Sequence, residues 1–250
     1  MKKLLYIALI AYFFTIIVPK YVFAYHPAVS RISQAASVET EKKQGKTEYF
    51  EYQLHLPVFT GISNHIFQKR LNNYYKTNIL SFKKKLEKEA KKYYDGAQQK
   101  PLSIHPYIAN VDHKVTYNKK PLLSLYINYY QYTGGAHGMY DWRANTFDIE
   151  TGKELTLADL FQKNSDYTNK IQQEIIRQIA QNKESFFPDA IEQVKKGDSF
   201  RFFLEPEHLT VYFPLYEIAP YASGIPQFRI PYTLLENDLK GKYKKILLNR

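Results

Sequence analysis

The spacing of hydrophobic residues divides the chain into an apolar start, a polar stretch and a long body of strand and helix patterns. Leu4 to Val18 is an unbroken run of apolar or small residues. Residues 25–46 are polar and have no period, which predicts a linker. From Thr47 hydrophobic and polar residues alternate with a period of two, which predicts a strand that ends near Pro57.

A long amphipathic helix is predicted after Gly61, because the period changes there. From about Ile62 to Tyr94 hydrophobic residues recur every three or four positions, as on one face of a helix. The positions that define this face are Phe67, Leu71, Tyr74 or Tyr75, Asn78 or Ile79, Phe82, Leu86, Ala90 and Tyr93.

The polar face of this helix carries most of the excess positive charge of the chain. Residues 61–95 contain nine Lys and Arg but only three acidic residues. The face is either solvated and laced with i,i+4 pairs such as Lys83 with Glu87 and Lys85 with Glu89, or a docking surface for an anionic polymer. In the second case the binding residues are Lys84, Lys88 and Lys92, which follow one another on one stripe.

The remainder of the chain alternates between strand and helix patterns. We first predict a hairpin over 102–132 that turns at 118–121, and then a strand over 146–149. A helical turn opened by a capping box of Thr156 and Asp159 follows, and after it come helices over about 166–182 and 188–196. The last predicted elements are strands over 200–204 and 209–213 and a strand within 220–231. This order predicts an α+β protein with an antiparallel sheet packed with one long N-terminal amphipathic helix and further shorter helices.

Composition narrows the class of protein. The chain of 250 residues has no Cys, so disulfides, thiolate chemistry, Cys-ligated metals and a lipoprotein anchor are excluded. Its aromatic fraction of 16%, with 23 Tyr and one Trp, is high enough to build a core and favours recognition surfaces.

The first 24 residues resemble a secretory signal peptide. Lys2 and Lys3 precede the apolar run, and Val22 and Ala24 suit a signal peptidase site, so we expect cleavage between Ala24 and Tyr25. An uncleaved membrane anchor is the alternative, although the run is shorter than the roughly 20 residues of a spanning helix. Either way the body lies outside the cytoplasm. Cleavage would remove three lysines and lower the formal net charge from +11 to +8.

Two blocks, YYQYTGGAHGMYDWRANTFDIETGKELTLADLF at 129–161 and FFLEPEHLTVYFPLYEIAPYASGIPQFRIPYTLL at 202–235, resemble the C-terminal half of the PdaC/RsiV-like extracellular domain. The strand and helix of 47–95 resemble its N-terminal half. The family includes the non-catalytic part of a peptidoglycan deacetylase and the lysozyme-sensing ectodomain of an anti-sigma factor. The resemblance implies an α+β envelope domain.

The chain departs from both family members in ways that bear on function. Only three residues precede the apolar run, so the cytoplasmic segment of the anti-sigma factor is not expected. The chain ends soon after the second block, so the catalytic domain of the deacetylase, with its paired His and Asp metal ligands, is not expected either.

The segment 134–138, GGAHG, is the most suggestive local motif. Its three glycines permit positive φ and close backbone approach, which would expose amides to an anion or place His137 at a rim. The structural alternative is a tight connection in which His137 forms local hydrogen bonds. The segment 216–224 offers Tyr216 and Tyr221 as binding aromatics, or as residues that pack beneath a loop.

Catalytic motifs are weak. Asp112, His113, His105 and Asp141 could approach one another, but no metal-ligand spacing such as HExxH is present. Glu205, Glu207 and Glu217 could form a carboxylate pair, or solvate turns. We therefore expect no enzyme, cofactor or metal site.

The domain prediction is a signal peptide over 1–24, a linker over 25–46 and one domain over 47–250, with halves of about 47–120 and 121–250. The functional prediction is a secreted, non-catalytic cell-envelope recognition module. Its expected ligand is an anionic wall polymer or peptidoglycan, or a wall-targeting protein such as lysozyme, and no nucleic acid. A membrane is a partner only if the first segment stays uncleaved. The alternative is an enzyme acting on cell-wall glycan.

Overall fold

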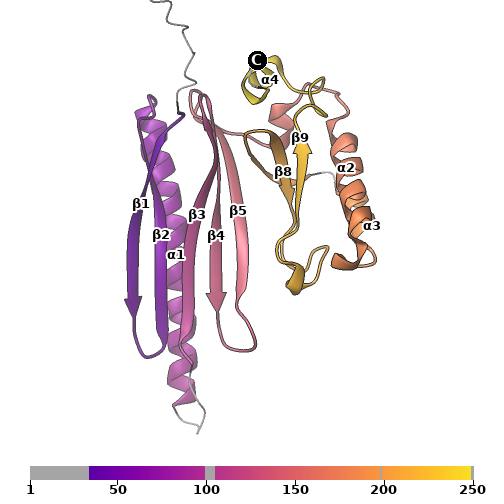
Figure 1. Ribbon diagram of the computed structural model, residues 1–250. Helices are drawn as coiled ribbons and strands as arrows, with labels where there is room; N and C mark the ends of the chain where they lie inside the picture. The colour runs from indigo at the N-terminus through magenta and orange to yellow at the C-terminus, as the bar shows by residue number, and fades with distance from the viewer. Residues whose placement is uncertain (1–33, 99–104, 198, 249–250) are drawn as a thin grey trace, which may run out of the picture. The chain divides into compact units, whose positions relative to one another are not determined.

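The computed structural model describes residues 34–98, 105–197 and 199–248. The first part contains β1 (Ser37–Lys46), β2 (Phe50–Thr60), α1 (His65–Ala97), β3 (Tyr107–Lys119), β4 (Leu122–Tyr132), β5 (Met139–Asp148) and β6 (Lys153–Glu154). The second part contains α2 (Tyr167–Gln181), α3 (Ala190–Lys196), β7 (Arg201–Leu204), β8 (His208–Tyr212), β9 (Gln227–Pro231) and α4 (Gly241–Leu247). The α+β class is confirmed (Figure 1).

Strands β1 to β6 form one six-stranded sheet in sequence order, and β7 to β9 form a three-stranded sheet. The prediction of an antiparallel sheet is wrong for one pair, because β2 and β3 are parallel. Parallel neighbours need a crossover connection, and α1 is that crossover: it runs back along the sheet so that β3 starts where β2 starts.

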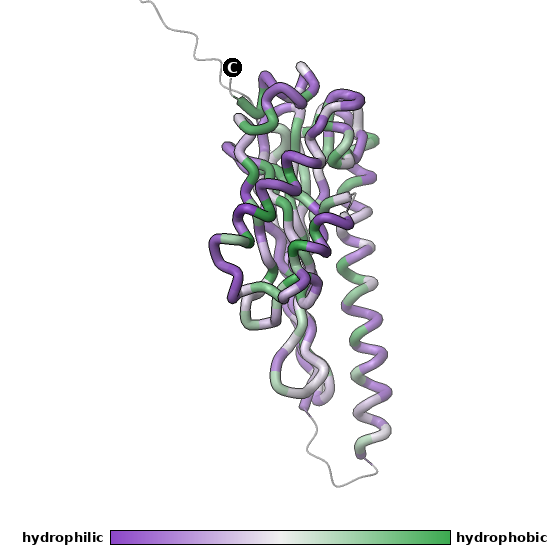
Figure 2. The backbone as a smooth tube through the Cα atoms, turned by 90° about the vertical axis from the view of Figure 1, so that its right-hand side faces the viewer, coloured by the Kyte–Doolittle hydropathy of each residue, from purple (hydrophilic) through white to green (hydrophobic). Residues whose placement is uncertain are grey.

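Helix α1 covers one face of the sheet, behind β2 and β3 in Figure 1. It begins after Asn64, whose side chain accepts a hydrogen bond from the Phe67 amide at 3.0 Å and caps the first turn. Its buried residues are Phe67, Leu71, Tyr75, Ile79, Leu86, Ala90 and Ala97. Figure 2 shows these hydrophobic positions as separate bands among hydrophilic ones, which is the pattern that predicted a helix here.

The prediction of a linker over 25–46 is wrong for its second half, where Ser37–Lys46 forms β1. β1 pairs antiparallel with β2 at the edge of the sheet. Edge strands are commonly charged, and β1 has only one large apolar residue, Val38, so no hydrophobic alternation marked it. The predicted signal peptide and residues 25–33 lie outside the described residues.

The second half packs against the opposite face of the six-stranded sheet at β4 and β5. The buried Ser124 of β4 joins the two sheets, because its Oγ accepts a hydrogen bond from the Leu204 amide of β7 at 3.0 Å. The predicted capping box of Thr156 and Asp159 is confirmed at a 3₁₀ turn. Helix α4 was not predicted. No helix of the described residues is both long and apolar enough to cross a membrane.

Candidate functional site

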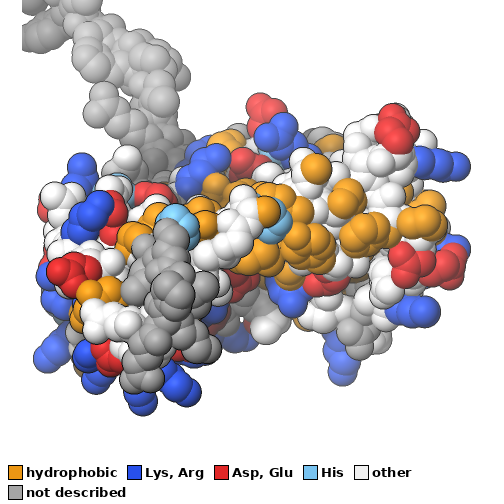
Figure 3. Space-filling view, turned by 90° about the horizontal axis from the view of Figure 1, so that it is seen from below, with side chains coloured by type: hydrophobic (Ala, Val, Ile, Leu, Met, Phe, Trp, Pro, Cys, Tyr) orange, Lys and Arg blue, Asp and Glu red, His pale blue; other side chains and the backbone are white. Residues whose placement is uncertain are grey.

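Three residues singled out in the sequence meet at the end of the β4–β5 hairpin. His137, in the turn, stacks on Tyr221 of the β8–β9 connection with ring centroids 3.8 Å apart. The Tyr221 ring also lies 5.9 Å from Tyr140 and 6.0 Å from Tyr216. We call His137, Tyr140, Tyr216 and Tyr221 the aromatic cluster. Figure 3 views the end of the protein that carries this turn and this connection, where hydrophobic side chains gather within a rim of charged ones.

The turn and the connection are held together through Gly138. The Tyr221 hydroxyl donates to the Gly138 carbonyl oxygen at 2.8 Å. His137 Nδ1 lies 3.0 Å from the same oxygen, so the imidazole is oriented locally. A Cβ at Gly138 would overlap the ring of Tyr130. The absence of a side chain at Gly138 therefore leaves room for the Tyr130 ring to pack against the turn.

The predicted lysine stripe lies elsewhere. Lys84, Lys88 and Lys92 are exposed on α1, and among the described residues none of them has an ion-pair partner. Lys83, in contrast, pairs with Glu87 at 2.6 Å, as predicted. The stripe lies on α1, whereas the aromatic cluster is formed by β5, the β4–β5 turn and the β8–β9 connection, so different elements carry the two groups of predicted binding residues.

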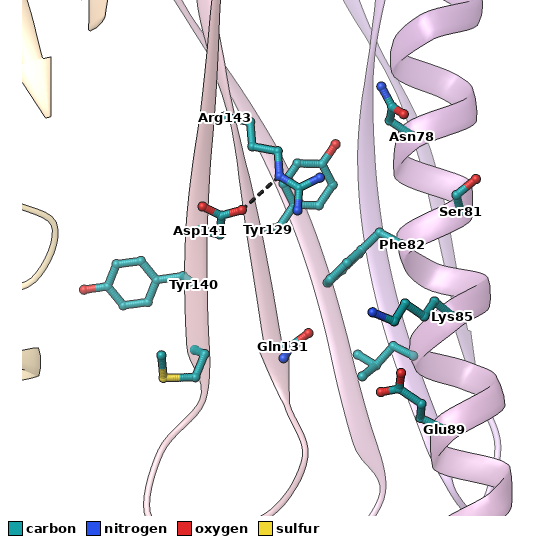
Figure 4. Close-up of a pocket in the computed structure, with 12 residues that line it drawn as sticks. Asn78, Ser81, Phe82, Lys85, Glu89, Tyr129, Gln131, Tyr140, Asp141 and Arg143 are labelled. Atoms are coloured by element: carbon teal, nitrogen blue, oxygen red, sulfur yellow. Dashed lines mark hydrogen bonds and ion pairs between the residues drawn. The ribbon is translucent and has the colours of Figure 1, made fainter. Parts of the chain in front are cut away.

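A groove of about 540 Å³ lies between α1 and strands β4 and β5 (Figure 4). Arg143 lies over the ring of Tyr129 at 4.5 Å and donates to Asp141 at 2.9 Å. Lys85 and Glu89 line the helix side, and the ion pair predicted between them is absent from the described residues. The lining that the structure describes therefore has two carboxylates, Asp141, which is bound to Arg143, and Glu89, which has no ion-pair partner among the described residues.

The opposite face of the sheet carries a hollow of about 530 Å³ that the sequence analysis missed. Its lining residues are Ile108, Asn110, Asp112, Asn128, Tyr130, Tyr140 and Trp142. They occupy alternate positions on β3, β4 and β5 and therefore share one face. The sequence feature that could have indicated this hollow is the placement of polar residues between buried ones in the strands, as with Asn128 between Ile127 and Tyr129. Tyr140 connects this hollow to the aromatic cluster.

Two histidine–carboxylate pairs lie on the strands or directly beside them. His55 Nδ1 bonds to Asp112, and His208 Nε2 lies 2.8 Å from Glu205. Burial raises the pKa of Glu205, but hydrogen bonds from Thr210 and His208 outweigh it and lower the pKa below its ordinary value. In the described part of the chain, no group of three or more His, Cys, Asp or Glu could hold a metal ion.

Comparison with known families assigns both halves of this fold. The family model described as "Deacetylase PdaC" matches residues 43–140, which include most of the six-stranded sheet and α1. The family model described as "Protein of unknown function (DUF3298)" matches residues 158–233, which include the three-stranded sheet. The chain therefore contains a PdaC/DUF3298-like domain.

Individual relatives agree with this assignment. The chain is 28% identical over 217 residues to the peptidoglycan-N-acetylmuramic acid deacetylase PdaC of Bacillus subtilis, a match that covers 84% of this chain. It spans 44% of that relative's length. A solved DUF3298 family member from Bacteroides fragilis has a TM-score of 0.63 at 22% identity, with 86% of this chain and 98% of that chain covered. Another, from Pseudomonas aeruginosa, has a TM-score of 0.53 at 20% identity, with 84% and 95% covered. These structures share the fold.

Proposed function

We propose that this chain is a non-catalytic recognition module of the bacterial cell envelope that binds an anionic wall polymer. The observation that carries the proposal is the stripe of Lys84, Lys88 and Lys92, which is exposed and has no acidic partner among the described residues. Unpaired cations in a row attract a polyanion at long range, and the attraction weakens as salt rises.

Two ion pairs beside the stripe reduce the net charge of the neighbouring surface of α1. Lys83 is bound to Glu87, and Lys91 is bound to Asp95 at 3.0 Å. The charges of these two pairs cancel, and so do the formal charges of Lys85 and Glu89, which have no ion-pair partner among the described residues, so the net charge of residues 83–95 equals that of the stripe. Because the three side chains are exposed, they are free to follow the phosphates or carboxylates of a flexible polymer.

The family relation supports a cell-wall setting. The Bacillus subtilis relative is named as a peptidoglycan deacetylase, and the regions matched here correspond to the part of the family outside its catalytic domain. We extend the wall association, but not the deacetylation, to this chain. The proposal includes an extracytoplasmic location, with the signal peptide predicted for residues 1–24.

A wall-targeting protein such as lysozyme is the second candidate ligand. The observation in its favour is the aromatic cluster, in which Tyr216 is 47% exposed and its ring lies 6.0 Å from that of Tyr221. Exposed tyrosines are common anchors of protein interfaces. An enzyme acting on wall glycan remains the alternative function, and acetate or reducing-sugar release by the purified chain would establish it.

The test compares two triple variants of equal charge. Lys84→Gln, Lys88→Gln and Lys92→Gln together should weaken retention on purified wall and teichoic acid. The control, Lys163→Gln, Lys183→Gln and Lys196→Gln, removes three exposed lysines of the second half and should bind as wild type. Wild-type retention should also fall as salt rises from about 0.05 to 0.5 M, because the Debye length shortens over that range. Equal binding by both variants, or retention that ignores salt, contradicts the proposal.

A further inference from the structure

The face of the six-stranded sheet opposite α1 carries two rows of residues that run across the strands. Cross-strand neighbours share a face, and the register places Gln44, Gln53, Asn110, Tyr130 and Tyr140 in one row. The second row is Lys42, His55, Asp112, Asn128 and Trp142. Five strands about 4.8 Å apart give each row a length of about 19 Å. We call this face the outer cleft; it includes the 530 Å³ hollow.

Several polar side chains of the outer cleft have no hydrogen-bond partner within the described part of the chain. In the described part of the chain, the side-chain amides of Gln53 and Asn110 have no hydrogen-bond partner, and neither does the Tyr130 hydroxyl. Asn128 Oδ1 is buried and also unpartnered among the described residues. Buried polar atoms of native proteins are almost always satisfied, so this amide lacks the partner that its position calls for. Its terminal torsion is soft, so the amide can turn towards a ligand.

The β5 end of the cleft presents aromatic rings in fixed positions. Trp142 is stacked on Tyr126 at a centroid distance of 4.1 Å, and Phe203 of β7 contacts its ring from the second sheet at 6.3 Å. Tyr140 is supported by Tyr221 of the aromatic cluster. The cleft therefore has a flat amide-rich floor that ends at an aromatic wall, and strands rather than loops hold it.

The outer cleft carries fewer charged side chains than the polar face of α1. Asp112 is bound to His55, so the one carboxylate of the two rows has a protein partner. The remaining side chains of the floor are amides, tyrosines and one lysine at the β1 edge. Such a surface gives a polyanion little to bind. It matches a ligand with a hydroxyl rim and weakly polarised C–H faces, because amides bond hydroxyls and the negative face of an aromatic ring attracts C–H groups.

We propose that the outer cleft is a binding site for an uncharged oligosaccharide laid across strands β1 to β5, with sugar rings against Trp142 and Tyr140 and hydroxyls on Gln53, Asn110 and Asn128. The site deepens the recognition role proposed above and rests on it for the source of the glycan. It is distinct from the lysine stripe, which lies on α1 on the other side of the sheet.

Trp142 is the single tryptophan of the chain, so its fluorescence reports on the cleft without labelling. The test titrates the full chain with a β-1,4-linked tetramer of N-acetylglucosamine. We expect a saturable change in Trp142 emission that persists at high salt. Gln53→Ala and Asn110→Ala should each weaken binding about fivefold, as expected for one net hydrogen bond. Asn73→Ala, which truncates an exposed amide on α1, is the matched control and should bind as wild type.

The outcomes separate the cleft from the lysine stripe. If the tetramer gives no saturable change at millimolar concentration, or if Gln53→Ala and Asn110→Ala bind it as wild type, the cleft inference is overturned. In that case stripe-dependent wall binding would leave the recognition role standing. Lysozyme binding that the two cleft variants weaken, without any response to the tetramer, would also overturn the inference by making the face a protein interface.

Discussion

Replacement of Asp148 by Asn tests how α4 is held to the six-stranded sheet. Asp148 is the last residue of β5 and is 1% exposed. Its Oδ1 accepts hydrogen bonds from the amides of Glu150 and Thr151, each at 3.1 Å. Its Oδ2 accepts a hydrogen bond from the ammonium group of Lys242 in α4. Asn keeps an oxygen for the two amides but turns its NH₂ group towards Lys242, so two donors then face each other.

The size of the effect follows from the bond that is lost. A hydrogen bond to a charged group contributes about 1.5–3 kcal/mol to stability. The side chain of Lys242 is 45% exposed, so water can solvate its ammonium in the variant and limit further loss. We therefore expect Asp148→Asn to lower the free energy of unfolding at pH 7 by about 2–3 kcal/mol. For a domain of this size that corresponds to a fall in Tm of about 5–10 °C.

The same contact predicts a pH dependence. Burial raises the pKa of Asp148, but the hydrogen bonds from Lys242 and from the amides of Thr151 and Glu150 outweigh it and hold the pKa below its ordinary value. A carboxyl with a lowered folded-state pKa contributes stability above its unfolded pKa, near 4, and loses it as pH falls through the folded value. The difference between wild type and Asp148→Asn should therefore be large at pH 7 and shrink at about pH 2.5.

Urea unfolding followed by Trp142 fluorescence measures both quantities. Asp95→Asn is the control, because Asp95 is exposed and pairs with Lys91 on the surface of α1, and its midpoint should match wild type. A loss below about 1 kcal/mol at pH 7 would refute the reasoning, since the charged bond would then contribute less than a neutral one. An equal loss at pH 7 and at low pH would show that the Asp148 charge is not responsible.

Three further predictions concern the site, the sheet contact and export. Gly138→Ala should displace the Tyr130 ring and weaken oligosaccharide binding, while the variant stays folded at the temperature of the titration. Unchanged binding would show that the position of the ring is not needed. Ser124→Ala should lower the free energy of unfolding by about 1–3 kcal/mol, because the buried Leu204 amide loses its acceptor; a urea midpoint equal to wild type would contradict this. The exported protein should begin at Tyr25, and an intact mass that retains residues 1–24 would instead support the membrane anchor.

Several elements were missed because their stabilising contacts are distant in sequence. Strand β1 carries charged residues and one large apolar residue, Val38, and becomes a strand because β2 offers it a free edge. Helix α4 has seven residues, too few for a period to stand out, and its Tyr243 and Leu247 are buried only after the second half has folded. The parallel pairing of β2 with β3 follows from where α1 delivers the chain, which a local pattern does not record.

For the candidate site too, local sequence indicated some residues, and contacts between distant residues decided the rest. The residue types of the segment 134–138 and of Tyr216 and Tyr221 were sufficient to nominate them from sequence. Their meeting depends on a hydrogen bond between residues 83 positions apart, Tyr221 and Gly138. The outer cleft was not nominated at all, because amides and tyrosines scattered over five strands carry no motif until the register aligns them.

The sequence by itself determined the periods of its helices and strands, the positive charge of α1 and the resemblance to an envelope domain, because each of these is a property of neighbouring residues. Only the tertiary structure decided which face of the sheet α1 covers and which it leaves open. That choice follows from burial: alternate residues of β4 such as Ile127 and Tyr129 lie against α1, and the residues between them, Asn128 and Tyr130, are left on the open face.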